Sequence, residues 1–333
     1  MLLGLNILLH FSMSFGGVGI LFNVLFAILL ISRPLTSFGF YRHFIFLSCC
    51  IDLFYASMHT IVCPLLFLGD GIFLLTPLHQ LPTAGMTRIA FLVWMISYNS
   101  VTVLITYCFI YRYSLLCNKY IERAFHEPLK LLVIGVVGMA VAGFMASQAF
   151  LATSAITPAG QIRADRIYGD DFGYNLTTAF MAGLDTETSP DITVSYIHIL
   201  VYIFLSFCLF IVMIFCGSRI HRAIASSVRS KQLAKAHRNV LSMLILQTLN
   251  PLLSMYLPAC GSGVLVMVQS GSLLVQYLIS GLYVCFPLLN PIIVVSFTKE
   301  YRQRLRRVIC CRYTEEPLAR KTTISNTNVR SIG

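Results

Sequence analysis

The sequence predicts an all-α membrane protein: a seven-transmembrane helix bundle with a short amphipathic cytoplasmic helix after the last span. Composition gives the first indication, because 57% of the 333 residues are hydrophobic, only 11% are charged and the mean hydropathy is +0.79. A soluble domain carries about 25% charged residues, so this chain cannot cover a globular surface with polar groups. Two further observations are the seven long apolar stretches and the unequal distribution of basic residues between their connections.

Each predicted span is long enough to cross a hydrocarbon core of about 30 Å, which requires roughly 20 apolar residues. The spans are Phe11–Ile31, Tyr41–Cys63, Met86–Tyr111, Leu129–Leu151, Ile192–Cys216, Asn239–Cys260 and Val266–Ser296. We therefore expect a short extracellular N-terminus over residues 1–10 and a single seven-helix domain over residues 11–296. The first stretch lacks a basic region at its start, which argues against a cleaved signal peptide.

The Lys and Arg residues lie mostly on alternate connections. Of the 24, 21 fall in the first, third and fifth connections and the C-terminal tail, and only Arg88, Arg163 and Arg166 fall on the other side. Basic residues are retained in the cytoplasm, so we expect the N-terminus outside and the C-terminus inside. The net charge of +11 would then face anionic lipid and protein partners on the cytoplasmic side, and nucleic acid is not an expected partner.

The two long connections have different characters. The outer one, residues 152–191, contains Pro158, Pro190 and more glycines and polar turns than a strand would tolerate, and its Asn175-Leu176-Thr177 sequon predicts glycosylation of Asn175. The inner one, residues 217–238, is basic and without acid. It is either a solvated loop or a helical extension of the fifth and sixth spans that presents a basic face to an acidic partner.

Beyond the last span, apolar residues recur at every fourth position. Phe297, Tyr301, Leu305 and Ile309 form a stripe among basic residues, which predicts an interfacial amphipathic helix over residues 297–311. Cys310 and Cys311 follow at the membrane surface, where palmitoylation is the expected modification. Residues 312–333 are polar and predict a disordered cytoplasmic tail.

The eleven cysteines are scattered, which favours apolar packing over a disulfide framework or a metal site. A bridge between Cys63 and Cys260 is conceivable, because both lie near outer helix ends.

Polar residues within the spans are candidates for function because an ionisable group there costs roughly 2.5 to 3.5 kcal/mol on insertion scales. Asp52 is the one carboxylate deep in a predicted span, and Asn23 and Asn290 lie at depths where they could join it in one cluster. Such a cluster either fixes helix packing or acts as a core switch. Pro251 and Pro291 interrupt the sixth and seventh helices and would be hinges or static bends.

The outer halves of the spans supply aromatic and hydrogen-bonding residues but no charge, which favours a small, neutral ligand. The pocket candidates are His59, Trp94, Tyr98, Asn99, Tyr196, Tyr202, Met255, Tyr256, Gln276 and Tyr277. We expect a minority of these residues to line the pocket and the rest to pack around it.

Several local motifs sharpen the interpretation. FIYRY at 109–113, QTLNPLLSMYLP at 247–258, FPLLNPIIVVSFTKEYR at 286–302 and the sequence GGVGILFNVLFAILL in the first span resemble the str-type serpentine chemoreceptors of nematodes, within the G-protein-coupled receptors. The resemblance implies a chemosensory receptor in the plasma membrane of a sensory cilium. It would bind an odorant-like small molecule outside and activate a heterotrimeric G protein inside.

The resemblance also implies roles for particular residues. Arg112 would close the third span at the G protein, with Tyr111 and Tyr113 as hydrogen-bonding neighbours, and Pro251 and Asn290-Pro291 would be the bends of the last two spans. The remaining candidates for G-protein coupling are the basic residues Arg219, Arg222, Arg229, Lys231 and Lys235.

The chain departs from the general receptor pattern in the same motifs. Tyr111 replaces the acidic neighbour of the arginine, so no ionic lock can form within this motif. Val294 stands where NPxxY has its tyrosine, and Asn290 stands where many members of the group have aspartate.

Other functional classes fit less well. A transporter or ligand-gated channel is the alternative, but neither internal repeats nor rings of charge are visible. An enzyme is not expected, since HExxH, GxSxG and clustered carboxylates are missing. We predict no cofactor: a retinal Schiff base would require a lysine that the seventh span lacks.

Overall fold

The computed structural model describes residues 2–32, 40–69, 71–154, 156–172, 176–226, 231–267, 273–298 and 301–303. In this part of the chain, seven helices are long and apolar enough to cross a membrane, which confirms the predicted bundle. The first five spans are formed by α1 (Leu2–Ser32), α2 (Tyr41–Val62), α3 (Ala84–Cys117), α5 (Pro128–Thr153) and α7 (Ile192–Ser226). The sixth comprises α8 (Lys231–Pro251), the π-helical turn η2 (Leu252–Tyr256) and α9 (Leu257–Met267), and the seventh is α10 (Leu273–Phe297).

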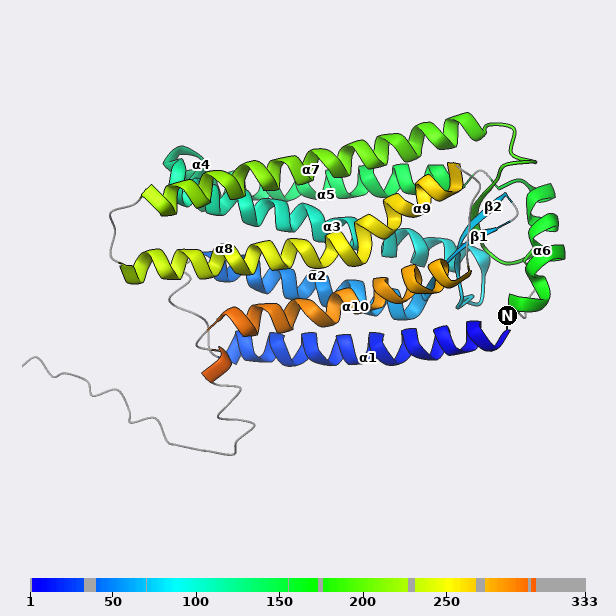
Figure 1. The fold of residues 1–333 in the computed structure, drawn as a ribbon, viewed down its shortest axis with the longest axis horizontal. Coiled ribbons are helices and arrows are strands. Elements are labelled where there is room, and N and C mark those ends of the chain that lie inside the picture. Colours follow the sequence, from blue (N-terminus) through cyan, green and yellow to red (C-terminus); the bar gives the residue numbers. More distant parts are fainter. Residues whose placement is uncertain are drawn as a thin grey trace, which may run out of the picture.

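The spans run side by side along the long axis of the molecule (Figure 1). Their outer faces carry large apolar side chains, such as Phe204 and Ile214, which are 65% and 68% exposed. Exposure of this kind suits contact with lipid rather than water. The short helix α4 (Lys119–His126) lies at the opposite end of the bundle from the N-terminus. Its N-cap is Asn118, whose side chain accepts from the backbone N–H of Tyr120 at 3.0 Å.

Two segment boundaries differ from the sequence expectation. Val266 and Met267 belong to the end of α9, so the seventh helix begins at Leu273 and not at Val266. Because no charge separates the last two spans, hydropathy alone could not locate this boundary. The fifth and sixth spans both continue as helix into the inner connection, to Ser226 and from Lys231, which agrees with the helical-extension interpretation. The interfacial helix of residues 297–311 and the tail lie largely outside the described residues.

A small antiparallel sheet covers the N-terminal end of the bundle and was not predicted. Its strands are β1 (Pro64–Gly69), β2 (Ile72–Pro77) and β3 (Ala182–Asp185), in the order β1-β2-β3. Gly69 pairs with Ile72, so the connection between β1 and β2 is the dipeptide Asp70-Gly71, and Gly71 has a φ of +74°. Asp-Gly between two apolar runs is a strong hairpin signal, because the turn requires positive φ.

The outer connection of residues 152–191 is more regular than expected. It contains the helix α6 (Pro158–Phe172) as well as β3, so the expectation that this connection would not tolerate a strand is wrong. Strand β3 pairs with β2 from Ile72 opposite Asp185 to Leu75 opposite Ala182. Gly183 fits because a Cβ there would lie 2.6 Å from the carbonyl oxygen of Phe73. The backbone groups of this polar, glycine-containing segment are therefore satisfied by pairing with β2, which the local sequence does not reveal.

The two faces of the sheet have different neighbours, as the alternation of side chains along a strand requires. One face packs against α6 in a small apolar cluster that includes Leu65, Phe67, Ile72 and Tyr168. Side chains of the opposite face, Leu66, Phe73 and Leu75, contribute to the main core and to the cavity described below. The sheet is thus a lid with α6 on its outside and the helix bundle on its inside.

Candidate functional site: a lidded cavity, a polar core and a buried arginine

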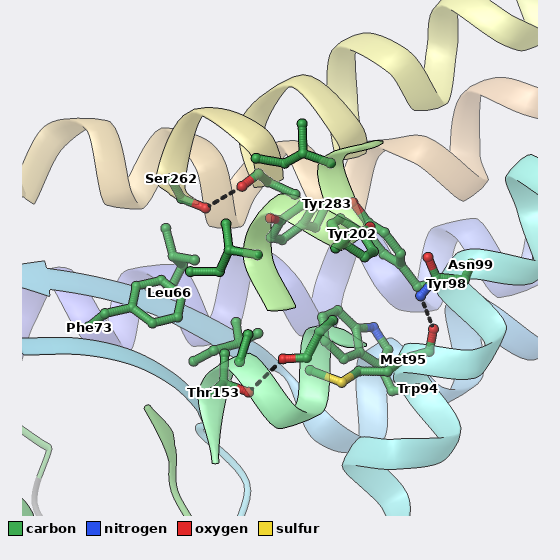
Figure 2. Close-up of a pocket in the computed structure, with 16 residues that line it drawn as sticks. Leu66, Phe73, Trp94, Met95, Tyr98, Asn99, Thr153, Tyr202, Ser262 and Tyr283 are labelled. Atoms are coloured by element: carbon green, nitrogen blue, oxygen red, sulfur yellow. Dashed lines mark hydrogen bonds between the residues drawn. The ribbon is translucent and has the colours of Figure 1, made fainter. Parts of the chain in front are cut away.

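A cavity of about 100 Å³ lies between the sheet and the outer halves of the helices (Figure 2). Its wall combines side chains from the sheet, α3, α5, α7, α9 and α10. These are Leu66, Phe73, Leu75, Trp94, Met95, Tyr98, Asn99, Ala149, Ala152, Thr153, Ile199, Tyr202, Ile203, Ala259, Ser262 and Tyr283. None of them is charged. An apolar cavity of about 150 Å³ holds benzene, so the present volume suits a ligand of comparable or smaller size unless the wall moves.

Four of the predicted pocket residues line this cavity: Trp94, Tyr98, Asn99 and Tyr202. Four others do not, namely His59, Tyr196, Met255 and Tyr256. His59 lies one layer behind the wall, with its ring centroid 6.2 Å from that of Trp94. Tyr256 likewise supports Tyr98 at 5.3 Å.

The other two candidates that do not line the cavity, Met255 and Tyr196, pack in or against the core. Met255 is fully buried in the core and Tyr196 packs against the core without facing the cavity. Span depth alone cannot tell the inner from the outer face of a helix, which explains these differences. Gln276 and Tyr277 lie outside the side chains that the structure describes.

Sequence reasoning missed part of the wall. Tyr283 faces the cavity from α10, where its ring lies 6.0 Å from Tyr98 and 6.5 Å from Trp94. Leu66 and Phe73 come from the hairpin, which the Asp70-Gly71 dipeptide could have revealed.

The cavity wall contains buried polar atoms without hydrogen-bond partners. Asn99 uses its amide nitrogen to donate to the carbonyl of Met95, one turn earlier, at 2.8 Å, while its Oδ1 has no partner. Trp94 Nε1 and the Tyr98 hydroxyl make no well-aligned hydrogen bond and interact only weakly with Tyr55 and Tyr202. A buried polar atom without a partner is costly, so these groups can distinguish ligands by the hydrogen bonds that each ligand offers.

Beneath the cavity, two prolines of α10 release backbone carbonyls that other helices capture. Proline lacks the N–H that would bond to the carbonyl four residues earlier. Pro287 thereby frees the carbonyl of Tyr283, which accepts from the Tyr55 hydroxyl of α2 at 3.1 Å. Pro291 frees the carbonyl of Pro287, which accepts from Asn23 Nδ2 of α1 at 2.8 Å. In a membrane, where water cannot solvate freed carbonyls, these bonds fix α10 against its neighbours.

The predicted polar cluster forms around Asp52, which is 3% exposed. Asn290 Nδ2 donates to Asp52, and Ser48 Oγ lies 3.5 Å from the same carboxylate. Gln247 of α8 donates to Asn290 Oδ1 at 3.1 Å, so the cluster connects α2, α8 and α10. Asn23 does not bond to Asp52; its side-chain Nδ2 donates to the backbone carbonyls of Gly19 and of Pro287 in α10.

The bend of the sixth span is joined to the same region. Pro251 ends α8 and precedes the π-helical turn η2, and Asn250 donates to the carbonyl of Phe286 at 3.0 Å. The motifs QTLNP and FPLLNP are therefore packed against each other through Gln247 and Asn250, two residues that sequence reasoning did not single out.

At the inner end of α3, Arg112 is 7% exposed and lies over the ring of Tyr41, 3.9 Å from its centroid. Its Nε has no hydrogen-bond partner. A void of only about 10 Å³ separates Arg112 and Leu116 from Ile220 of α7 and from Val240, Leu241 and Leu244 of α8. The inner end of the bundle is thus closed around the arginine.

The flanking tyrosines of FIYRY make ring contacts with neighbouring helices. Tyr111 stacks on Tyr41 with an interplanar angle of 7° and packs against Phe44 and Phe125. Tyr113 faces Phe215 of α7 at 6.1 Å. The contacts of both rings are therefore aromatic, and a hydrogen-bonding role beside Arg112 stays a prediction.

The other predicted sites are only partly described. Arg219 and Arg222 are exposed near the inner end of α7. Arg229, Asn175, Cys310 and Cys311 lie outside the described residues, as do the side chains of Lys231 and Lys235. Cys63 and Cys260 are both free, so the conceivable bridge is absent. No group of metal-ligating side chains occurs among the described residues.

Comparison with known proteins identifies the family. The family model described as "Serpentine type 7TM GPCR chemoreceptor Str" matches residues 9–306. The chain is also 23% identical over 324 residues to "Serpentine receptor class r-10" of Caenorhabditis briggsae, covering 91% of this chain and 89% of that protein. With seven spans and a match over most of its length, the chain belongs to the Str family of serpentine seven-transmembrane chemoreceptors.

Proposed function

We propose that this chemoreceptor binds a small, neutral, largely apolar molecule in the cavity beneath the sheet and activates a heterotrimeric G protein at its other end. The observation that carries the ligand class is the wall of the cavity, whose described residues include no charged side chain but hold the unpaired Asn99 Oδ1. A ligand that fills this space gains from burial of apolar surface, and its orientation is set by one or two hydrogen bonds.

A contiguous set of contacts supports coupling between the two ends. Tyr283 lines the cavity, and its carbonyl is held by Tyr55, whose ring packs against Phe286 at 5.6 Å. Phe286 in turn accepts from Asn250 of α8 through its carbonyl. A ligand that moves α10 can therefore change the position of α8, whose Leu241 and Leu244 close the space beside Arg112. This requires the ligand to bind the open state more tightly than the closed one.

The cellular setting follows from the same proposal. The excess of basic residues at the end bearing Arg112 supports an extracellular N-terminus and a cytoplasmic coupling surface. We place the receptor in the plasma membrane, in the sensory cilium that the family resemblance implies. Asn175 is then on the outside and available for glycosylation, while Cys310 and Cys311 are available for palmitoylation inside. The exposed Arg219 and Arg222 would be joined by Arg229, Lys231 and Lys235 in contacting an acidic G-protein surface.

The test is ligand-dependent nucleotide exchange on purified G protein, with the receptor in lipid nanodiscs and a panel of small neutral odorants. Ala149→Phe fills the cavity and should abolish the response, whereas Ala140→Phe, on the exposed face of the same helix, should leave it intact. Arg112→Ala should abolish exchange without abolishing ligand binding. A response that survives both Ala149→Phe and Arg112→Ala would overturn the proposal, and a ligand-evoked current without any G protein would favour a channel.

A further inference from the structure

A second and larger cavity, about 820 Å³, opens on the side of the bundle between α7 and α8. Its wall is almost entirely apolar and includes Phe207 and Ile214, which are 62% and 68% exposed on the outer surface of α7. Phe109 of α3 forms the floor. This cavity, here called the lateral groove, faces outward and does not include Arg112, which lies in the separate small void at the inner end.

The bend in the sixth span accounts for the groove. Leu252, at the start of the π-helical turn, lines the groove where α8 ends. Prolines and π-turns are common causes of sharp changes in helix direction. Gly217 contributes on the α7 side by leaving space where a Cβ would lie 3.3 Å from the Phe109 ring.

Charge is confined to one end of the groove. His221 and Arg222 lie at its cytoplasmic end, both are exposed, and no acidic residue lines any part of it. From Phe207 to Arg222, a helix rise of 1.5 Å per residue gives a length of about 22 Å. Half of a bilayer, with its headgroup layer, is about 20–22 Å thick. The groove therefore spans one leaflet, with apolar walls in the hydrocarbon and cations at the headgroups.

We propose that the lateral groove binds an anionic phospholipid of the inner leaflet, with one acyl chain between α7 and α8 and the phosphate at His221 and Arg222. The apolar length accommodates the chain, and the basic end selects an anionic headgroup. A lipid in this position would separate α7 from α8, the two helices that close the space beside Arg112. The site requires neither the odorant nor the G protein, so it goes beyond the proposed function.

The experiment uses the full-length receptor in nanodiscs that contain a phospholipid probe with a diazirine near the end of one acyl chain. The probe carries either a phosphatidylserine or a phosphatidylcholine headgroup. After irradiation, mass spectrometry should place the phosphatidylserine adducts on residues 207–214 and 248–252, at the end of the groove away from Arg222, with less labelling by phosphatidylcholine. Arg222→Ala should lower labelling by phosphatidylserine about fivefold, the effect of one cation near a membrane surface.

Matched variants distinguish a lipid bound in the groove from lipid that only touches the surface of the receptor. Thr248→Trp places an indole inside the groove and should abolish these adducts, while Leu246→Trp lies outside it on the same helix and should not. Arg219→Ala, an exposed arginine that does not line the groove, should have a smaller effect than Arg222→Ala.

Arg222 is exposed, so its removal should not impair folding, and thermal unfolding of each variant verifies this. Equal labelling by the two headgroups, labelling that Thr248→Trp does not change, or crosslinks between two receptor chains at the groove would each overturn the proposal. None of these readouts depends on signalling, so failure here leaves the proposed function standing.

Discussion

The guanidinium carbon of Arg112 lies 3.9 Å from the centroid of the Tyr41 ring, so the arginine of FIYRY is held by an aromatic face from α2. In this chain the residue before the arginine is Tyr111, not an acid, and its ring stacks on the same Tyr41. Arg112 is almost fully buried, and burial of a cation is costly unless a partner compensates. A desolvated cation–π contact is worth about 2 kcal/mol, which makes Tyr41 the group that stabilises the closed inner end.

Replacing Tyr41 by leucine should therefore raise nucleotide exchange in the absence of ligand. Loss of a contact worth about 2 kcal/mol lowers the cost of moving Arg112 out of its closed surroundings. We expect basal exchange to increase severalfold and the thermal unfolding temperature to fall. Tyr41→Phe keeps the ring over Arg112 but removes the hydroxyl, which also interacts with Arg112, so both measurements should lie between wild type and the leucine variant. If the phenylalanine variant is as active as the leucine variant, the ring face is not what holds the arginine.

Removing the hydroxyl of Tyr55 should destabilise the bundle. This hydroxyl is the partner of the Tyr283 carbonyl, which Pro287 leaves without a backbone donor. A buried carbonyl without a partner costs about 1–3 kcal/mol, so Tyr55→Phe should lower thermal stability in detergent measurably.

Tyr107→Phe is the matched control, because its hydroxyl donates to the Ile134 carbonyl at 3.0 Å within a helix that has no proline one turn later. That carbonyl remains satisfied by its own helix, so the control should lose less stability. Equal losses for the two variants would contradict the role assigned to Pro287.

The sequence predicted the number of spans, the polar contact between Asp52 and Asn290 and four of the residues that line the cavity, because hydropathy and depth in a span can be read locally. It did not predict which face of α2 or α7 points inward, and so it placed His59 and Tyr196 at the cavity. The lid was missed for another reason. Strand β3 forms through pairing with β2, more than a hundred residues earlier in the chain, and only the Asp70-Gly71 turn had a local signal.

Asn99 should select ligands by their ability to donate a hydrogen bond. Its Oδ1 is buried and unpaired, so a ligand hydroxyl or amine N–H that reaches it gains a partner at little desolvation cost to the protein. Asn99→Leu should weaken the response to such ligands about tenfold, consistent with one hydrogen bond, and should leave hydrocarbon ligands of the same size unaffected. Dose–response curves for matched pairs of an alcohol and its hydrocarbon test this. A uniform loss for both classes would indicate a packing role.

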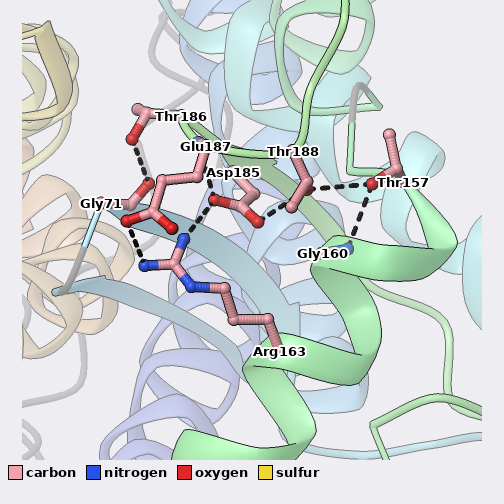
Figure 3. Close-up of polar contacts among 8 residues, drawn as sticks. All are labelled: Gly71, Thr157, Gly160, Arg163, Asp185, Thr186, Glu187 and Thr188. Carbon is pink, nitrogen blue, oxygen red and sulfur yellow. Dashed lines mark hydrogen bonds and ion pairs between the residues drawn. The ribbon is translucent and has the colours of Figure 1, made fainter.

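Arg163 should control the rigidity of the lid (Figure 3). It donates to Asp185 at 2.7 Å and to Glu187 at 2.6 Å, and it joins α6 to the end of β3. Asp185 is fully buried, so Arg163→Ala leaves a charge without its main partner, at a cost of about 1.5–3 kcal/mol. We expect faster hydrogen exchange in β3 and α6 and faster ligand dissociation.

Arg166→Ala removes an exposed charge from the same helix and serves as the control for the lid. It should change neither the rates of hydrogen exchange in β3 and α6 nor the rate of ligand dissociation, because surface charges contribute little to stability. The prediction fails if the two arginine variants behave alike.

Cys63 should resist alkylation although it lies just beyond the C-terminal end of α2, next to the sheet. Its side chain is 1% exposed, and burial raises the pKa of its thiol to about 11, well above that of an exposed thiol. The thiolate is the reactive form, so at pH 8 its population is about a hundredfold lower than for an exposed thiol, and the rate should fall with it. Raising the pH towards 11 should increase labelling, since deprotonation is then favoured.

The matched variant is Ala84→Cys, which places an exposed thiol at the start of α3 on the same side of the membrane. A helix N-terminus favours the thiolate, so this cysteine should react rapidly with a membrane-impermeant maleimide added to intact cells. Mass spectrometry should find Cys63 unmodified until the receptor is denatured. Because access from outside is required, labelling of Ala84→Cys also tests the proposed orientation, and equal rates at the two positions would show that the lid does not protect Cys63.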